Sequence, residues 1–221
     1  MTRTIGCLHA HHSNIGYVEH ALRPDGWELV HHVDPGLLRR ISQDPGFGEA
    51  QARSRAAEQV QWIASSNVDA ILITCTNYIA LLDEARLDID VPVIKLDESF
   101  FSHVCSIRGP QLVLFTNPAT VEGTMRRLEA FASEHGVPLD VESRVIEDAF
   151  KLVMRGDSEA YKREVSCHIR HALTADPGNR VSVAQLSMVE AAEAVERELG
   201  VSIGNPLEPL AQAVRAALGT Q

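Results

Sequence analysis

VDAILITCTN, residues 68–77, is an apolar run that stops at a thiol followed by two small polar side chains. A short run of Ile and Leu bounded by polar residues predicts a strand buried on both faces, as in parallel sheets covered by helices. Ligands of open α/β sheets bind outside the carboxyl ends of the strands. Cys75, Thr76 and Asn77 are therefore candidates for a site, although a free cysteine is more often a small buried hydrophobe.

On both sides of this strand, short apolar runs alternate with longer amphipathic stretches, which is typical of βαβ units around a parallel sheet. Further strands are expected at 4–8, 27–33, 91–96, 111–115, 139–146, 181–186 and 201–203. Helices are expected at 15–22, 37–42, 50–65, from 78 onward, and at 97–106, 118–135, 158–173, 188–199 and 206–218. In the 50–65 helix, the spacing predicts that Ala57, Val60 and Ile63 face inward.

Strand, polar turn and helix recur at comparable places in two halves of the chain, although no short sequence repeat is visible. The pattern predicts an α/β protein with two similar domains, each a parallel sheet flanked by helices. We expect the first domain to span 1–96 and to include the closing helix, 206–221. The second domain is expected to span 97–205.

The composition limits the class of protein. The chain has 221 residues and 45% hydrophobic content, enough to bury a sizeable core. Its formal net charge of -10 argues against nucleic acid or an anionic membrane as a partner. The four cysteines are far apart, and neither a signal-peptide pattern nor a membrane-length apolar run is visible. We therefore expect a cytoplasmic protein with reduced thiols.

Four motifs in order resemble those of the aspartate/glutamate racemase superfamily, which includes hydantoin racemases, maleate isomerases and arylmalonate decarboxylases. They cover nearly the whole chain and are Cys75-Thr76-Asn77, Val91-Pro92-Val93-Ile94 with Asp97-Glu98, Thr116-Asn117-Pro118-Ala119-Thr120-Val121, and Ala184-Gln185-Leu186-Ser187-Met188. Ser13-Asn14, with Glu19 further on, is similar to a Ser-Asn signature of the maleate isomerase branch. The resemblance implies a site in the cleft between the two domains, no cofactor and a homodimer.

The resemblance also implies the reaction, which is cysteine-dependent proton transfer at a carbon α to the carboxylate of a small acid. The enediolate formed by removing that proton carries charge that fixed donors must stabilise. Cys75 is then the catalytic group. The residues expected to bind the substrate are Ser13, Asn14, Thr76, Asn77, Thr116, Asn117, Thr120, Gln185 and Ser187. Capping and turn formation are the structural alternatives for such side chains.

One residue departs from the family pattern. The racemases place a second cysteine after the strand of the second half, where this chain has Leu186. A symmetrical two-thiol relay is therefore not expected. A single-cysteine decarboxylase is an alternative, although that branch keeps the second-half cysteine rather than the first.

Histidines at the end of the first strand suggest the missing acid/base. Glutamate racemases carry an aspartate there, so His9 or His11 could tune the Cys75 thiol or act as a second acid/base. His9-Ala10-His11 also has metal-ligand spacing, and His31-His32 ends the neighbouring strand, which leaves a metal-dependent hydrolase as an alternative. No third ligand stands out in the second half, and we expect no metal. A third alternative is a protein that binds a small carboxylate without turning it over.

Overall fold

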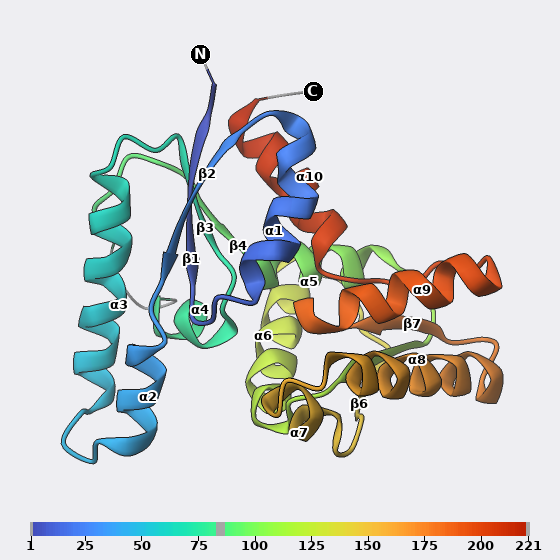
Figure 1. Ribbon diagram of the computed structural model, residues 1–221. Coiled ribbons are helices and arrows are strands. Elements are labelled where there is room, and N and C mark those ends of the chain that lie inside the picture. Colours follow the sequence, from blue (N-terminus) through green and yellow to red (C-terminus); the bar gives the residue numbers. More distant parts are fainter. Residues whose placement is uncertain (1, 83–86, 220–221) are drawn as a thin grey trace. The chain divides into compact units, whose positions relative to one another are not determined.

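A computed structural model describes residues 2–82 and 87–219 of the chain (Figure 1). It divides into two compact units, each of which is described by itself. The first unit comprises Met1–Ser99 together with Leu210–Gln221, and the second comprises Phe100–Pro209. Among the described residues, no helix has the length and apolar character needed to cross a membrane.

The first unit contains a four-stranded parallel sheet in the order β2-β1-β3-β4. Its strands are β1 (Thr4–His9), β2 (Glu28–Val33), β3 (Ala70–Ile73) and β4 (Val93–Lys95). All four residues of β3 are buried, as its run of Ile and Leu predicts. Because the strands are parallel, their carboxyl ends lie at one edge of the sheet.

Helices cover both faces of this sheet, and Figure 1 shows α3 on one side with α1 and α10 on the other. The helical elements of the unit are α1 (Asn14–Leu22), η1 (Arg23–Asp25), α2 (Gly36–Gln43), α3 (Glu49–Ala64), α4 (Thr76–Leu82), the start of α5 (Leu96–Ser106) and most of α10 (Leu207–Leu218). Val60 and Ile63 of α3 are buried as expected. Ala57 is only half-buried, and Ala56 takes the inward position instead.

The second unit contains a three-stranded parallel sheet in the order β6-β5-β7. Its strands are β5 (Gln111–Phe115), β6 (Val141–Val145) and β7 (Arg180–Val183). Its other elements are the rest of α5, η2 (Pro118–Thr120), α6 (Val121–Glu134), α7 (Ala149–Met154), α8 (Ser158–Ala175), η3 (Leu186–Met188) and α9 (Val189–Leu199). Asn117 caps η2 by accepting a hydrogen bond from the Ala119 N–H.

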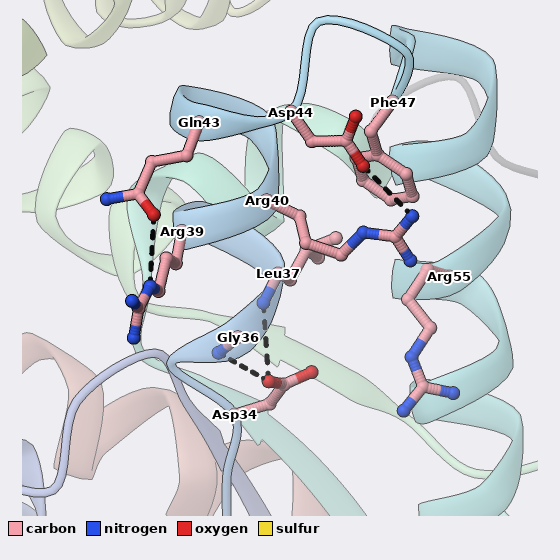
Figure 2. A pocket seen from close by; sticks show the side chains of 9 residues that line it. All are labelled: Asp34, Gly36, Leu37, Arg39, Arg40, Gln43, Asp44, Phe47 and Arg55. Atoms are coloured by element: carbon pink, nitrogen blue, oxygen red, sulfur yellow. Dashed lines mark hydrogen bonds and ion pairs between the residues drawn. The ribbon is translucent and has the colours of Figure 1, made fainter.

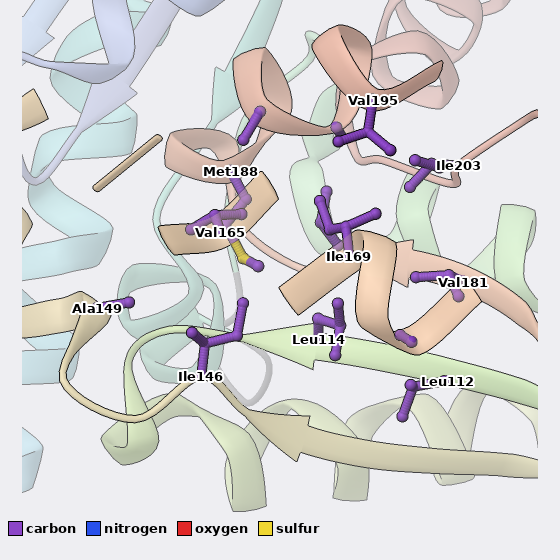
Figure 3. Close-up of a cluster of buried hydrophobic side chains, with 14 of the residues drawn as sticks. Leu112, Leu114, Ile146, Ala149, Val165, Ile169, Val181, Met188, Val195 and Ile203 are labelled. Carbon is purple, nitrogen blue, oxygen red and sulfur yellow. The ribbon is translucent and has the colours of Figure 1, made fainter. Parts of the chain in front are cut away.

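Alternate residues of β5 point into two separate cores. Leu112 and Leu114 pack in the cluster that includes residues of α8 and α9, which Figure 3 shows. Val113 and Phe115 pack in the cluster that includes residues of α5 and α6. A strand buried on both faces is the arrangement expected of a central strand in a parallel sheet.

One expectation for the second unit is wrong, and one helix of that unit was not expected. The run 201–203 forms no strand, because the pairing there is limited to a single bridge between Ser182 and Gly204. Helix α7 was not anticipated, and its six residues are too few for an amphipathic period to be visible.

Candidate functional site

Cys75 lies just beyond the carboxyl end of β3, directly before α4 begins at Thr76. Its side chain is half-buried. The Thr76 hydroxyl donates to Asp97 Oδ1 at 3.2 Å, and the Asp97 side chain is buried. Asn77 is exposed. The strand, thiol and helix therefore follow one another as the sequence predicts. The hydrogen bond to Asp97 ties Thr76 to the first turn of α5.

His9, the last residue of β1, lies at the centre of a buried polar network. Its ring has no solvent exposure. His9 Nδ1 lies 2.8 Å from Thr74 Oγ1, and His9 Nε2 lies 2.8 Å from Nδ1 of His31 on β2. Asn14 Nδ2 also donates to Thr74 Oγ1, at 3.2 Å. The network therefore joins β1 and β2 to the residue that precedes Cys75.

A carboxylate completes this network at its outer end. His31 Nε2 lies 3.2 Å from Oε1 of Glu19, which is on α1. Glu19 also accepts from Arg23 Nε at 2.5 Å, and this hydrogen bond is the main reason that the pKa of Glu19 is lowered. An ionised Glu19 accepts hydrogen bonds only, so His31 Nε2 carries a proton and donates it to Glu19.

Burial lowers the pKa of His9 to about 4, with His31 and His32 adding to the effect. His9 is therefore neutral at pH 7 and has one N–H and one acceptor nitrogen. With His9 neutral, Thr74 donates to His9 Nδ1, His9 Nε2 donates to His31 Nδ1, and His31 Nε2 donates to Glu19. Each ring nitrogen of His9 and His31 then has a hydrogen-bond partner, as a buried polar network requires.

His11 and Ser13 lie apart from this buried network. Both side chains are exposed, and they interact with each other, with 2.8 Å between His11 Nδ1 and Ser13 Oγ. The ring of His11 also packs on His12, with centroids 4.2 Å apart. His9 and His11 thus have different hydrogen-bond partners.

In the second unit, the Gln185 side chain forms hydrogen bonds with the turn that follows β5. Its Oε1 accepts from the Thr116 N–H at 2.8 Å, the Thr116 hydroxyl at 2.7 Å and the Asn117 N–H at 3.2 Å. Its Nε2 donates to Thr120 Oγ1 at 3.4 Å. Three of the predicted substrate-binding residues are therefore tied together by a fourth, at the carboxyl ends of β5 and β7.

A tyrosine that the sequence did not single out extends this second network. Tyr161 OH lies 3.2 Å from Thr116 Oγ1 and 2.7 Å from Ser187 Oγ. Burial raises the pKa of Tyr161, so its hydroxyl stays protonated at neutral pH. Leu186, between Gln185 and Ser187 in the sequence, is buried in η3.

The pocket shown in Figure 2 has a volume of about 530 Å³ and lies between α2 and the start of α3. Three arginines line it, but each has a partner: Arg39 bonds Gln43, Arg40 pairs with Asp44, and Arg55 pairs with Glu58. None of the predicted site residues is among its described lining residues. We therefore base the candidate site on the strand ends rather than on this pocket.

A match to a family profile shows which family the chain belongs to. The profile of the Asp/Glu/Hydantoin racemase family matches residues 17–216, which is most of the chain. This chain is a member of the Asp/Glu/hydantoin racemase family. No curated protein matches its sequence at a significant level.

Solved structures of two racemases and of a decarboxylase are similar in fold to this chain. Aspartate racemase from Picrophilus torridus is 12% identical, with a TM-score of 0.70 over 99% of this chain and 95% of its own. Allantoin racemase from Klebsiella pneumoniae is 19% identical, with a TM-score of 0.69 over 99% and 89%. A glycine-to-cysteine variant of arylmalonate decarboxylase is 18% identical, with a TM-score of 0.63 over 99% and 94%. These likenesses confirm the expected fold.

Sequence reasoning missed two members of the polar networks, Thr74 and Tyr161, and it also missed Cys7, which lies near His9 and His31. A signal existed for Cys7, because Cys7 and His9 are two residues apart on a strand and so share one face of the sheet. The parallel pairing then sets His31 beside Cys7. The roles assigned to Cys75, His9, His11 and the substrate-binding residues stay predictions.

Proposed function

We propose that this racemase-family protein is an enzyme that transfers a proton at a carbon α to the carboxylate of a small acid, with Cys75 as the acid/base. The observation that carries the proposal is the position of Cys75. It is a half-buried thiol at the carboxyl end of a central strand, in a chain whose family is defined by racemases. Ligands of open α/β sheets bind at this edge.

In the proposed step, the Cys75 thiolate takes the α proton and the C–H electron pair becomes part of an enediolate. Fixed donors near the carboxylate lower the energy of that charge. The proposed donors of the first unit are the backbone N–H groups of Thr76 and Asn77 and the Asn77 side chain, because the Thr76 hydroxyl already donates to Asp97. Return of a proton from the Cys75 thiol to the α carbon restores the thiolate and completes the cycle.

His9 acts in this proposal as a positioning residue. Its two ring nitrogens are already engaged by Thr74 and His31, and the ring is fully buried. A neutral ring with both nitrogens occupied is poorly suited to exchange protons with a substrate. His9 instead fixes Thr74, and through the backbone it fixes the start of the segment that carries Cys75.

Leu186 favours chemistry on one face of the substrate. A leucine cannot give or take a proton, and it stands where the family resemblance predicts a second thiol. Isomerisation that needs one proton donor is compatible with this residue. So is decarboxylation, in which the C–C bond to a leaving carboxylate breaks, CO₂ departs and Cys75 protonates the resulting enediolate. A lyase reaction is therefore the second candidate.

A substrate panel in deuterium oxide tests the proposal. Amino acids, hydantoins, maleate and substituted malonates are incubated with the protein, with Cys75→Ala and with Cys167→Ala, and NMR follows exchange at the α carbon and turnover. Cys167 is exposed on α8, so its variant controls for the loss of a thiol. We expect the unmodified protein and Cys167→Ala to act on at least one compound and Cys75→Ala to be inactive. Equal activity of Cys75→Ala would overturn the assignment.

A further inference from the structure

Cys7, His9 and His31 converge on one point between β1 and β2. The Cys7 sulfur, one ring nitrogen of His9 and one of His31 all lie within 4.8 Å of one another. The fold creates this convergence, because Cys7 and His9 share a face of β1 and Cys7 is paired with His31 in the register of the sheet. Cys7 and His9 have no solvent exposure.

On one ring nitrogen, each of the two histidines has the kind of hydrogen-bond partner that orients histidine ligands in metal sites. His9 Nδ1 faces the Thr74 hydroxyl, and His31 Nε2 faces the Glu19 carboxylate. The remaining nitrogens, His9 Nε2 and His31 Nδ1, point at each other across 2.8 Å. Histidine ligands in metal sites characteristically use their second nitrogen to donate to a carboxylate, hydroxyl or carbonyl.

We propose that Cys7, His9 and His31 bind a single borderline-soft divalent metal ion of the zinc type. Thiolate and imidazole ligands favour zinc over magnesium or calcium, which take oxygen ligands. The three ligands come from the interior of the sheet, so the ion would stabilise the first unit rather than meet a substrate. This site is distinct from Cys75, and the proposal does not depend on the proposed function.

Converting the network into this site requires the ligand atoms to shift and two protons to move. Zn–N distances of about 2.0–2.1 Å set two nitrogen ligands roughly 3.3 Å apart, so the two imidazoles must separate by about half an ångström. His9 moves its ring proton from Nε2 to Nδ1 and donates it to Thr74, whose hydroxyl can turn to Leu8 O at 3.4 Å. The Cys7 thiol gives its proton to water, and its sulfur donates an electron pair to the ion.

The sequence pattern also marked His9 and His31 for a metal, but it paired them with His11 rather than with Cys7. His11 is exposed and bonded to Ser13, so it serves as a control rather than as a ligand. Its close contact with His12 forms a surface pair that could take up metal weakly and without specificity. The experiment must therefore separate the buried trio from this surface pair.

Metal titration of the full-length protein, freed of metal by chelator and kept reduced, provides the test. Zn²⁺ binding is measured by competition with a chromophoric chelator, and Co²⁺ is added separately as a spectroscopic probe. We expect one equivalent of Zn²⁺ and a near-ultraviolet thiolate-to-cobalt absorption band. The band identifies a sulfur ligand without any need for a substrate.

The variants assign the ligands. Cys7→Ala should abolish the band, while His11→Gln and Cys75→Ala should retain both the band and the Zn²⁺ affinity. Glu19→Gln, which changes the outer partner of His31 and also the ion-pair partner of Arg23, should weaken Zn²⁺ binding by about 10–100-fold. If circular dichroism shows that Cys7→Ala is unfolded, His31→Gln replaces it in the test.

Three results would overturn the proposal. The first is that the unmodified protein binds Zn²⁺ no more tightly than Cys7→Ala or His31→Gln does. The second is that the cobalt band survives in Cys7→Ala. The third is that His11→Gln loses the bound metal while the variants of the buried trio keep it, which would assign the metal to the surface pair.

Discussion

Thr74 Oγ1 lies 2.8 Å from His9 Nδ1, although 65 residues separate the two in the sequence. They come from the carboxyl ends of the neighbouring strands β1 and β3, and Thr74 directly precedes Cys75. Thr74 is buried and also accepts from Asn14. This one hydroxyl therefore couples the end of the first strand to the segment that carries the proposed catalytic thiol.

Thr74→Val should destabilise the protein by about 1–3 kcal/mol, because a nearly isosteric side chain leaves His9 Nδ1 and Asn14 Nδ2 without their partner. Urea unfolding followed by circular dichroism measures the effect. Thr174→Val on the exposed end of α8 is the control and should change the free energy of unfolding by less than about 0.5 kcal/mol. Equal effects of the two variants would show that the Thr74 hydroxyl has no special structural role.

Gln185→Leu should cost about 1–3 kcal/mol of stability, because the Thr116 N–H, the Thr116 hydroxyl and the Asn117 N–H all lose their acceptor. Thr120→Val is the matched control, since it removes only the longer contact with Gln185 Nε2 and the hydroxyl bond to Asn117 O. Its effect should be clearly smaller. Amide hydrogen exchange at Thr116 and Asn117 should accelerate in Gln185→Leu, and unchanged exchange would contradict the structural account.

Strand and helix positions follow from the sequence because burial on both faces leaves a clear apolar run, as at residues 70–73, and because Asn117-Pro118 is a strong helix-start signal. Side-chain partners do not follow in the same way. The sequence marked Thr116, Asn117 and Gln185 as substrate contacts, whereas the structure bonds them to one another. Pairing across the sheet decides such partners, and a local pattern carries no information on it. The same limit hid Cys7, although the sequence marked His9 and His31 as potential metal ligands.

Gly6→Ala should destabilise the first unit by about 1–3 kcal/mol through overpacking. A Cβ at this position would lie 2.3 Å from Ile63 Cγ2 and 3.3 Å from Val68 Cγ1, and a branched core side chain cannot move away freely. Gly16→Ala in α1 is the control, because nothing lies within 4 Å of its Cβ, and it should stabilise by about 0.5–1 kcal/mol. Thermal or urea unfolding of both variants checks the opposite signs.

Tyr78 and Tyr161 should remain protonated until the protein unfolds in alkali. Burial raises the pKa of both hydroxyls. A folded-state pKa above the unfolded value means that the contribution to stability is complete below about pH 10 and is lost as the pH rises through the folded-state pKa. Ultraviolet titration of phenolate formation should therefore show a late step that coincides with loss of the circular dichroism signal. Tyr161→Phe should reduce the size of that step, and two early, unfolding-independent ionisations would contradict the burial.

Proton exchange at the α carbon of a single-enantiomer substrate in deuterium oxide is the most direct measurement of the central claim. The substrate is an active compound from the panel, and NMR and chiral chromatography follow deuterium and configuration together. We predict exchange with retained configuration for the unmodified protein, no exchange for Cys75→Ala, and the appearance of the opposite enantiomer for Leu186→Cys. Exchange by Cys75→Ala at the rate of the unmodified protein would contradict the claim that Cys75 transfers the proton, and efficient racemisation by the unmodified protein would contradict transfer on one face.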